Sequence, residues 1–177
     1  AYMDLLATVV KEKKLASRAS EEASHPQFEL SFSLDAHIPS DYGSEAQRIT
    51  MYKELSDCGN DKELAQFSKK IRDVYGPYPD EVGNLLVKKK IENYLNSPLY
   101  ANFVEALGSY QVTMSRQFCA KASIYRQLDD RLKPLAVKLR LRVNGEHLFE
   151  FILTKTKDYL ADLLFLCENL DEIYQLS

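Results

Sequence analysis

Three histidines and one adjacent pair of acids are the residues in this sequence best suited to proton transfer or metal binding. His25, His37 and His147 are isolated, and none has a cysteine or an acidic residue nearby at the spacing of a metal ligand. Asp129 and Asp130 are neighbours, but adjacent helical residues point about 100° apart, so their carboxylates cannot converge on one proton or ion. We therefore expect no catalytic, cofactor-binding or metal site.

Two basic segments could contact the phosphates of a nucleic acid. The run from Lys88 to Lys90 would spread around a helix rather than line one face, which favours a solvated surface. Lys138, Arg140 and Arg142 alternate along a predicted strand and share one face, but acidic residues of the next strand are expected to neutralise much of their charge. A nucleic-acid contact module is therefore the alternative to a protein-binding domain. A small hydrolase is a third interpretation, and no clustered groups support it.

The composition is that of an ordinary globular domain. The chain has 177 residues, of which 45% are hydrophobic and 28% charged, which suffices for one domain with a core. The formal net charge of -3 gives no surface-wide attraction for a polyanion. Cys58, Cys119 and Cys167 lie far apart without a Cys-x-x-Cys pair, which favours a reducing, cytoplasmic setting. The longest apolar runs fall short of the ~20 residues of a membrane helix, so we expect no membrane partner.

The elements that would position these side chains begin with a helix and a linker. Apolar residues recur at helical spacing from Tyr2 to Val10, and a charged stretch rich in Ser and Ala follows, up to His25. We expect residues 1–26 to be a helix and a linker, and residues 27–177 to form one domain.

Strand and helix patterns alternate along the rest of the chain. Residues 28–34 and 110–114 alternate apolar and polar side chains, as half-buried strands do. Helices are predicted to begin near Ser44, Asn60 and Pro79, and the first of them has an apolar stripe of Ile49, Tyr52 and Leu55. Further helices are predicted over residues 99–107, 120–132 and 157–174. The expected fold is α+β, with about four mostly antiparallel strands and helices packed on the sheet.

A hairpin is predicted around Asn144 and Gly145. A three-residue loop of residues 143–145, with Gly145 in the left-handed conformation, would pair Arg142 with Glu146 and Lys138 with Glu150. The other face would then pair Leu139 with Phe149 and Val137 with Phe151. A two-residue turn would mix polar and apolar faces, so we favour the three-residue loop.

From Phe28 to about Leu86 the sequence resembles the C-terminal domain of the bacterial transcription-repair coupling factor, Mfd. An apolar strand leads into a segment from Ile38 to Tyr42, and Asp73 to Leu86 resembles the family signature Asp-Arg-Phe-Gly-x-x-Pro-x-x-Val-x-x-Leu-Leu. The positions that carry the motif are Pro39, Tyr42, Arg48, Tyr52, Tyr75, Gly76 and Pro79.

The resemblance implies a regulatory role without catalysis. The parent protein would be an ATP-dependent DNA translocase that displaces stalled RNA polymerase and recruits nucleotide excision repair through UvrA. Its C-terminal domain docks on the N-terminal repair-protein-like module and hides the UvrA-binding surface. Lys70, Asp73 and Val74 are the expected interdomain contacts. Val74 departs from the family, which usually has Arg there, and Tyr75 stands in place of Phe.

Overall fold

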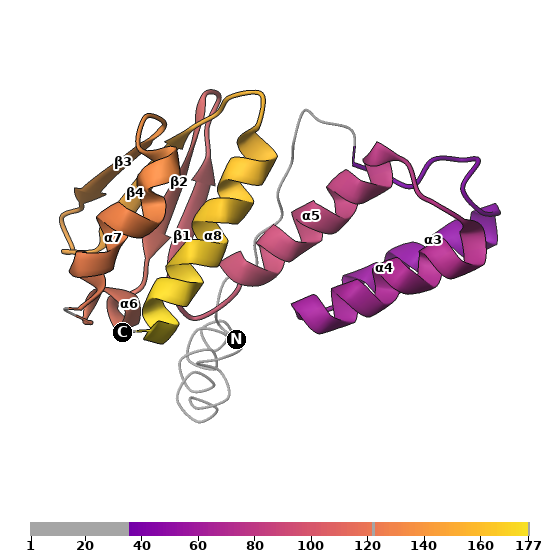
Figure 1. Ribbon diagram of the computed structural model, residues 1–177, viewed down its shortest axis with the longest axis horizontal. Coiled ribbons are helices and arrows are strands. Elements are labelled where there is room, and N and C mark those ends of the chain that lie inside the picture. The colour runs from indigo at the N-terminus through magenta and orange to yellow at the C-terminus, as the bar shows by residue number, and fades with distance from the viewer. Residues whose placement is uncertain (1–35, 122, 177) are drawn as a thin grey trace, which may run out of the picture.

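The computed structural model describes residues 36–121 and 123–176, so the predictions for residues 1–26 and for the strand 28–34 lie outside the described residues. Helices come first, and they are α3 (Glu45–Ser56), α4 (Asp61–Tyr75) and α5 (Asp80–Leu95). Figure 1 shows α3 and α4 side by side at one end of the molecule, with α5 leading from them to the sheet. Because α5 contributes Val82 to one core and Ile91 to another, a single helix joins the two halves.

The helix starts follow the predicted capping residues. Ser44 and Gln47 form a complete capping box, in which each side chain bonds the backbone of the other residue. The side chain of Asn60 accepts from the backbone of Glu63 at 2.9 Å, as a polar residue before a helix does. Pro79 is the residue that precedes α5, whereas we expected it as the first helical residue. Gly76 ends α4 as predicted.

The buried face of α3 differs from the predicted one. Met51 and Leu55 are buried, whereas Ile49 and Tyr52 are exposed. The prediction of a stripe through Ile49, Tyr52 and Leu55 was wrong because Met51 lies one helical turn before Leu55 and therefore shares its face. Tyr52 has a polar role instead, since its hydroxyl accepts a hydrogen bond from the backbone N–H of Ile38 at 2.7 Å.

Four antiparallel strands form an open sheet with the order β1-β2-β4-β3. They are β1 (Tyr100–Glu105), β2 (Ser109–Met114), β3 (Leu139–Val143) and β4 (Phe149–Thr154). Helices α7 (Ile124–Leu132) and α8 (Tyr159–Leu176) cover one face of the sheet (Figure 1). The alternating apolar residues of β2 and β4 face these helices, and the fully buried members of this large core include Tyr110, Val112, Met114, Phe151, Leu153, Leu163 and Leu166.

Strand β1 stands where we predicted a helix over residues 99–107. Its register shifts between Tyr100 and Asn102, so that Tyr100 and Phe103 both face the large core although they are three residues apart. That spacing is typical of a helix, and the bulge therefore hid the alternation that would have indicated a strand.

The hairpin between β3 and β4 keeps the predicted faces but not the predicted register. Arg142 pairs with Glu150, and Val143 pairs with Phe149, so both registers considered from the sequence were wrong. The left-handed residue is His147, with φ of 65°, rather than Gly145. Five residues, 144–148, separate the paired Val143 and Phe149, and the partner of Arg142 moves by four positions, from Glu146 to Glu150. Because this shift is even, every side chain stays on its expected face.

Asn144 explains the displacement of this loop. Its side-chain oxygen accepts from the backbone N–H groups of Glu146 at 2.8 Å and Leu148 at 3.0 Å, and its amide donates to Glu150 at 3.1 Å. Three bonds from one side chain thus hold the turn over residues 144–148 instead of the predicted 143–145.

Replacing Asn144 by Ala should therefore destabilise the hairpin. We expect Asn144→Ala to lower the free energy of unfolding in urea by about 1–2 kcal/mol, since buried or half-buried donors lose their acceptor. Asn102→Ala, on exposed β1, should change it by less than about 0.5 kcal/mol. Equal values for the two variants would show that Asn144 does not hold the turn.

The helix predicted over residues 120–132 starts four residues later than expected, and a separate turn precedes it. A single turn, α6 (Arg116–Cys119), is capped by Ser115, whose hydroxyl accepts from the N–H of Phe118, and α7 begins only at Ile124. A 3-10 turn over Lys133–Leu135 then accommodates Pro134. The C-terminal helix is confirmed, and it buries the predicted residues Leu160, Leu163, Leu166, Cys167, Leu170 and Ile173.

Candidate protein-interaction surface

The three residues predicted for interdomain contact share one exposed face of α4. Asp73 and Val74 lie three and four positions after Lys70, so each of them is a neighbour of Lys70 on the helix surface. All three are exposed, and Val74 keeps 60% of its surface accessible although it is apolar. We call the face formed by these three residues the α4 face. It combines a basic, an acidic and an apolar side chain over one helical turn.

Lys70 is already engaged within the chain. Its ammonium group lies 2.8 Å from the carboxylate of Glu54 on α3, and this hydrogen bond raises the pKa of Lys70. Both side chains are well exposed, so the pair contributes little to folding but orients the lysine. Glu54 could not be predicted from the sequence as the partner of Lys70, because it lies 16 residues away on another helix and no local pattern links the two residues. A docking partner would therefore meet a neutralised pair beside Asp73 and Val74.

The end of α4 is held rigidly beneath this face. The hydroxyl of Tyr42 lies 3.1 Å from the carbonyl oxygen of Ile71 and 2.7 Å from that of Gly76, so its proton is shared between two carbonyls at the end of α4. Burial, followed by the nearby Tyr78 and Tyr75, raises the pKa of Tyr42, which keeps the phenol protonated as a donor. The rings of Tyr42 and Tyr75 pack at a centroid distance of 5.8 Å, so Tyr75 keeps the aromatic packing expected for the signature.

The loop before α3 is held by Arg48. Its guanidinium donates at 2.7 Å to the carbonyls of Ser40 and Gly43, and the carbonyl of Pro39 accepts from the N–H of Tyr42. Together with Tyr52, which binds the N–H of Ile38, these residues are structural. The motif residues thus support the α4 face and are not part of it. They are Pro39, Tyr42, Arg48, Tyr52, Tyr75, Gly76 and Pro79.

Arg72 is a neighbour that the sequence did not single out. Its guanidinium lies 5.8 Å from the centroid of the Tyr78 ring, within the range of a cation–π contact. The family usually has Arg at the position of Val74. In this chain a positive charge lies two residues earlier, at Arg72, next to the turn that follows α4. Val74 itself offers only apolar surface.

Both basic segments contain residues that form ion pairs with acidic side chains of the same chain. On α5, the ammonium of Lys90 lies 3.3 Å from Glu168 and 3.9 Å from Asp61, and residues 88–90 are half-buried. This arrangement supports the prediction that Lys88 to Lys90 form no continuous basic face.

On the hairpin, Lys138 binds Asp162 at 2.8 Å and Arg142 binds Glu150 at 2.7 Å. The hydrogen bond from Arg142, assisted by Asn144, lowers the pKa of Glu150. The predicted pair of Lys138 with Glu150 was wrong, because the shifted register places Lys138 near α8. Among the residues that the structure describes, Arg140 forms no ion pair.

The candidate chemical residues do not come together. His37 and His147 are exposed, as are Asp129 and Asp130, and His25 lies outside the described residues. Over residues 36–121 and 123–176, no group of three or more His, Cys, Asp or Glu side chains is arranged to hold a metal ion. Burial raises the pKa of each thiol, to about 12 for Cys167, and the three cysteines are free. None of the described helices is long and apolar enough to cross a membrane.

Comparison with known proteins decides the family. The model of the TRCF domain matches residues 32–117, which include α3, α4, α5 and the first two strands. The chain matches the TRCF domain family over these residues. The matched region extends to residue 117, beyond Leu95, after which the resemblance read from the sequence fades.

Curated relatives of this TRCF domain are named transcription-repair-coupling factor. The chain is 27% identical over 173 residues to the protein of Staphylococcus haemolyticus, and 26% identical over 172 residues to that of Staphylococcus epidermidis. Both alignments cover at least 96% of this chain but only 14% of the relative, so the chain spans about one seventh of their length. The Staphylococcus aureus protein is 24% identical over 196 residues.

A solved structure shows the same fold. The crystal structure of the C-terminal domain of a transcription-repair coupling factor superposes with a TM-score of 0.63 at 22% identity, over 82% of this chain and 92% of that one. This likeness shows the same α+β fold.

Proposed function

We propose that this TRCF domain is a non-catalytic regulatory domain of a transcription-repair coupling factor. It docks through the α4 face onto the N-terminal repair-protein-like module of the same protein and covers the surface that UvrA binds. The parent protein would be a cytoplasmic, ATP-dependent DNA translocase that displaces stalled RNA polymerase and recruits excision repair. Within it, the domain restrains recruitment until the motor engages, and it requires no cofactor.

The α4 face carries this proposal. An apolar side chain that is 60% exposed stands beside Asp73, on a helix whose end is fixed by the hydroxyl of Tyr42. Burial of an exposed valine is worth about 1–2 kcal/mol at roughly 25 cal/mol per Å² of apolar surface. A partner would gain that energy without first ordering the helix, and such preorganisation raises affinity.

The domain boundary is part of the same proposal. Residues 1–26 would belong to the end of the preceding motor module, and residues 27–177 would form the regulatory domain. The small core around α3 and α4 and the large core under the sheet are joined through α5, so both would move with the domain as it docks or releases.

Charge reversal on the α4 face tests the proposal in the full-length parent protein. The double variant Asp73→Lys with Val74→Glu should weaken docking, because it places two wrong charges in the contact, and should raise the affinity for UvrA at least about tenfold, equivalent to 1.4 kcal/mol. Binding of UvrA can be measured by fluorescence anisotropy in the absence of DNA and nucleotide.

A matched charge reversal elsewhere provides the control. Asp130 is exposed on α7, and Asp130→Lys should leave the affinity for UvrA unchanged. If the double variant binds UvrA no better than the unmodified protein, the α4 face is not the docking surface.

A further inference from the structure

Strand β3 leaves one side of its backbone unpaired. It is the last strand in the order β1-β2-β4-β3 and pairs only with β4. The carbonyl of Lys138 accepts from Thr154, and the N–H of Asn144 donates to Leu148, so the even-numbered residues are those that bond β4. Hydrogen bonding alternates along an antiparallel strand, and Leu139, Leu141 and Val143 therefore direct their N–H and C=O groups to the open edge.

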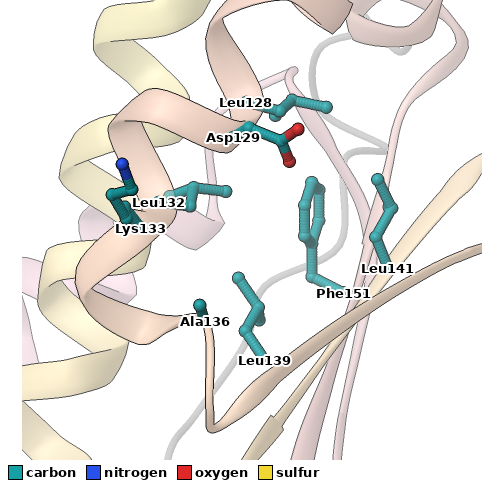
Figure 2. A pocket seen from close by; sticks show the side chains of 8 residues that line it. All are labelled: Leu128, Asp129, Leu132, Lys133, Ala136, Leu139, Leu141 and Phe151. Carbon is teal, nitrogen blue, oxygen red and sulfur yellow. The ribbon is translucent and has the colours of Figure 1, made fainter.

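Two of these residues, Leu139 and Leu141, place their side chains at an apolar groove. Leu141 is 45% exposed and Val143 is 55% exposed, and Val137 just before the strand is almost fully accessible. Figure 2 shows Leu139, Leu141 and Phe151 facing Leu128 and Leu132 across an opening, with Ala136 at its end. The groove has a volume of about 490 Å³ and separates β3 from α7. Asp129 and Lys133 are the charged residues at its wall.

The opposite face of β3 is basic. Arg140 and Arg142 share that face, and Arg142 is bound to Glu150, whereas Lys138 precedes the strand and binds Asp162 on α8, the helix that covers the other face. Arg140 is exposed without an ion pair among the described residues. A strand that pairs with this edge would therefore need apolar side chains on the side of the groove and acidic side chains on the side of the basic residues.

We propose that the edge of β3 binds an extended segment of another protein in which acidic and apolar residues alternate. The segment would add a strand to the sheet, with its acidic side chains opposite Arg140 and its neighbours and its apolar side chains in the groove lined by Leu128, Leu132 and Phe151. Strand addition of this kind draws affinity from backbone hydrogen bonds and specificity from pockets for alternate side chains. This surface is separate from the α4 face.

A second copy of the chain fits this edge poorly. In an antiparallel pairing of two β3 strands about Leu141, Arg140 of each strand would lie opposite Arg142 of the other. Pairing about Arg140 would set Lys138 opposite Arg142. Like charges directly opposite are destabilising, so the basic stripe disfavours self-association and leaves an acidic strand as the complementary occupant.

A synthetic peptide tests the proposal directly. The probe is a labelled Glu-Val-Glu-Leu-Glu-Val-Glu peptide, titrated with the whole chain at low salt and followed by fluorescence anisotropy. Arg140→Glu should weaken binding at least about tenfold, and it should make the chain prefer the same peptide with Lys in place of Glu. Lys62→Glu, an equal charge change at the exposed start of α4, should bind as the unmodified chain does.

A second variant tests the backbone contribution. Leu141→Pro removes an N–H that points to the open edge and not to β4, so the ladder with β4 is kept and the peptide should lose affinity. Thermal unfolding of each variant shows that it remains folded, and Arg140→Glu changes only an exposed side chain.

Several results would overturn the proposal. These are no binding of the acidic peptide, equal binding by Arg140→Glu, a dimer in sedimentation that Leu141→Pro dissolves, or binding of a DNA oligonucleotide that Arg140→Glu removes while the peptide does not bind.

Discussion

Truncating Leu163 to Ala should lower the free energy of unfolding by about 2–5 kcal/mol, the range for a fully buried leucine. Leu163 lies on α8 with none of its surface exposed, and it packs against the sheet within the large core. The loss combines the transfer of the missing carbons with the cavity that close packing cannot refill. Alanine is an excellent helix former, so the helix itself is not weakened. Urea denaturation followed by circular dichroism measures the effect.

Leu176→Ala is the matched control for this prediction. It makes the same chemical change at the end of the same helix, at a side chain that is 60% exposed. We expect a change of less than about 0.5 kcal/mol, as for surface sites without special contacts. Similar losses for both variants would mean that α8 does not pack on the sheet through the face described.

Replacing Gly76 by Ala should cost about 1–3 kcal/mol, the range for a residue held in a sparsely populated backbone conformation. Gly76 has φ of 92° and ψ of -178°, a region that only glycine enters readily. No atom outside its chain neighbours lies within 4 Å of where a Cβ would stand, so the cost is conformational and not a clash. The same change should loosen the end of α4 and therefore the α4 face.

Gly108→Ala separates this effect from a general cost of adding a methyl group. Gly108 also has free space around it but does not have a positive φ. It should be neutral or slightly stabilising, because alanine reduces the entropy of the unfolded chain. A neutral Gly76→Ala would show that the turn after α4 does not require the positive φ.

The helical part of the fold follows from local signals. Ser44 with Gln47 marks the start of α3, and the apolar stripe of α8 is long enough to identify both the helix and its buried face. The face of α3 was harder to predict, because Met51 and Ile49 point in different directions and only packing against α4 decides between them. Local patterns give the element and leave the choice of face to tertiary contacts.

Two parts of the sheet could not be derived from periodicity alone. In β1, a bulge after Tyr100 breaks the alternation of two and imitates the spacing of a helix. In the hairpin, the Asn-Gly pair suggested a turn centred on itself, but the side chain of Asn144 binds two later N–H groups and moves the loop forward. The pairing of β1 depends on one bulge, and the register of the hairpin depends on one side chain, so neither follows from a repeating pattern.

The candidate surface was partly accessible from the sequence. The family resemblance singled out Lys70, Asp73 and Val74, and the structure exposes all three on α4. The bond between Lys70 and Glu54 and the edge of β3 required the fold, because they depend on an interhelical contact and on strand order.

A nuclear magnetic resonance titration tests the central proposal most directly. The chain, labelled with ¹⁵N, is mixed with the separate N-terminal module of the parent protein. We predict saturable shifts of the backbone amides that concentrate on residues 70–78 and disappear with Asp73→Lys and Val74→Glu. The absence of any shift at high concentration of the module, or shifts confined to surfaces away from α4, would contradict a docking role for this face.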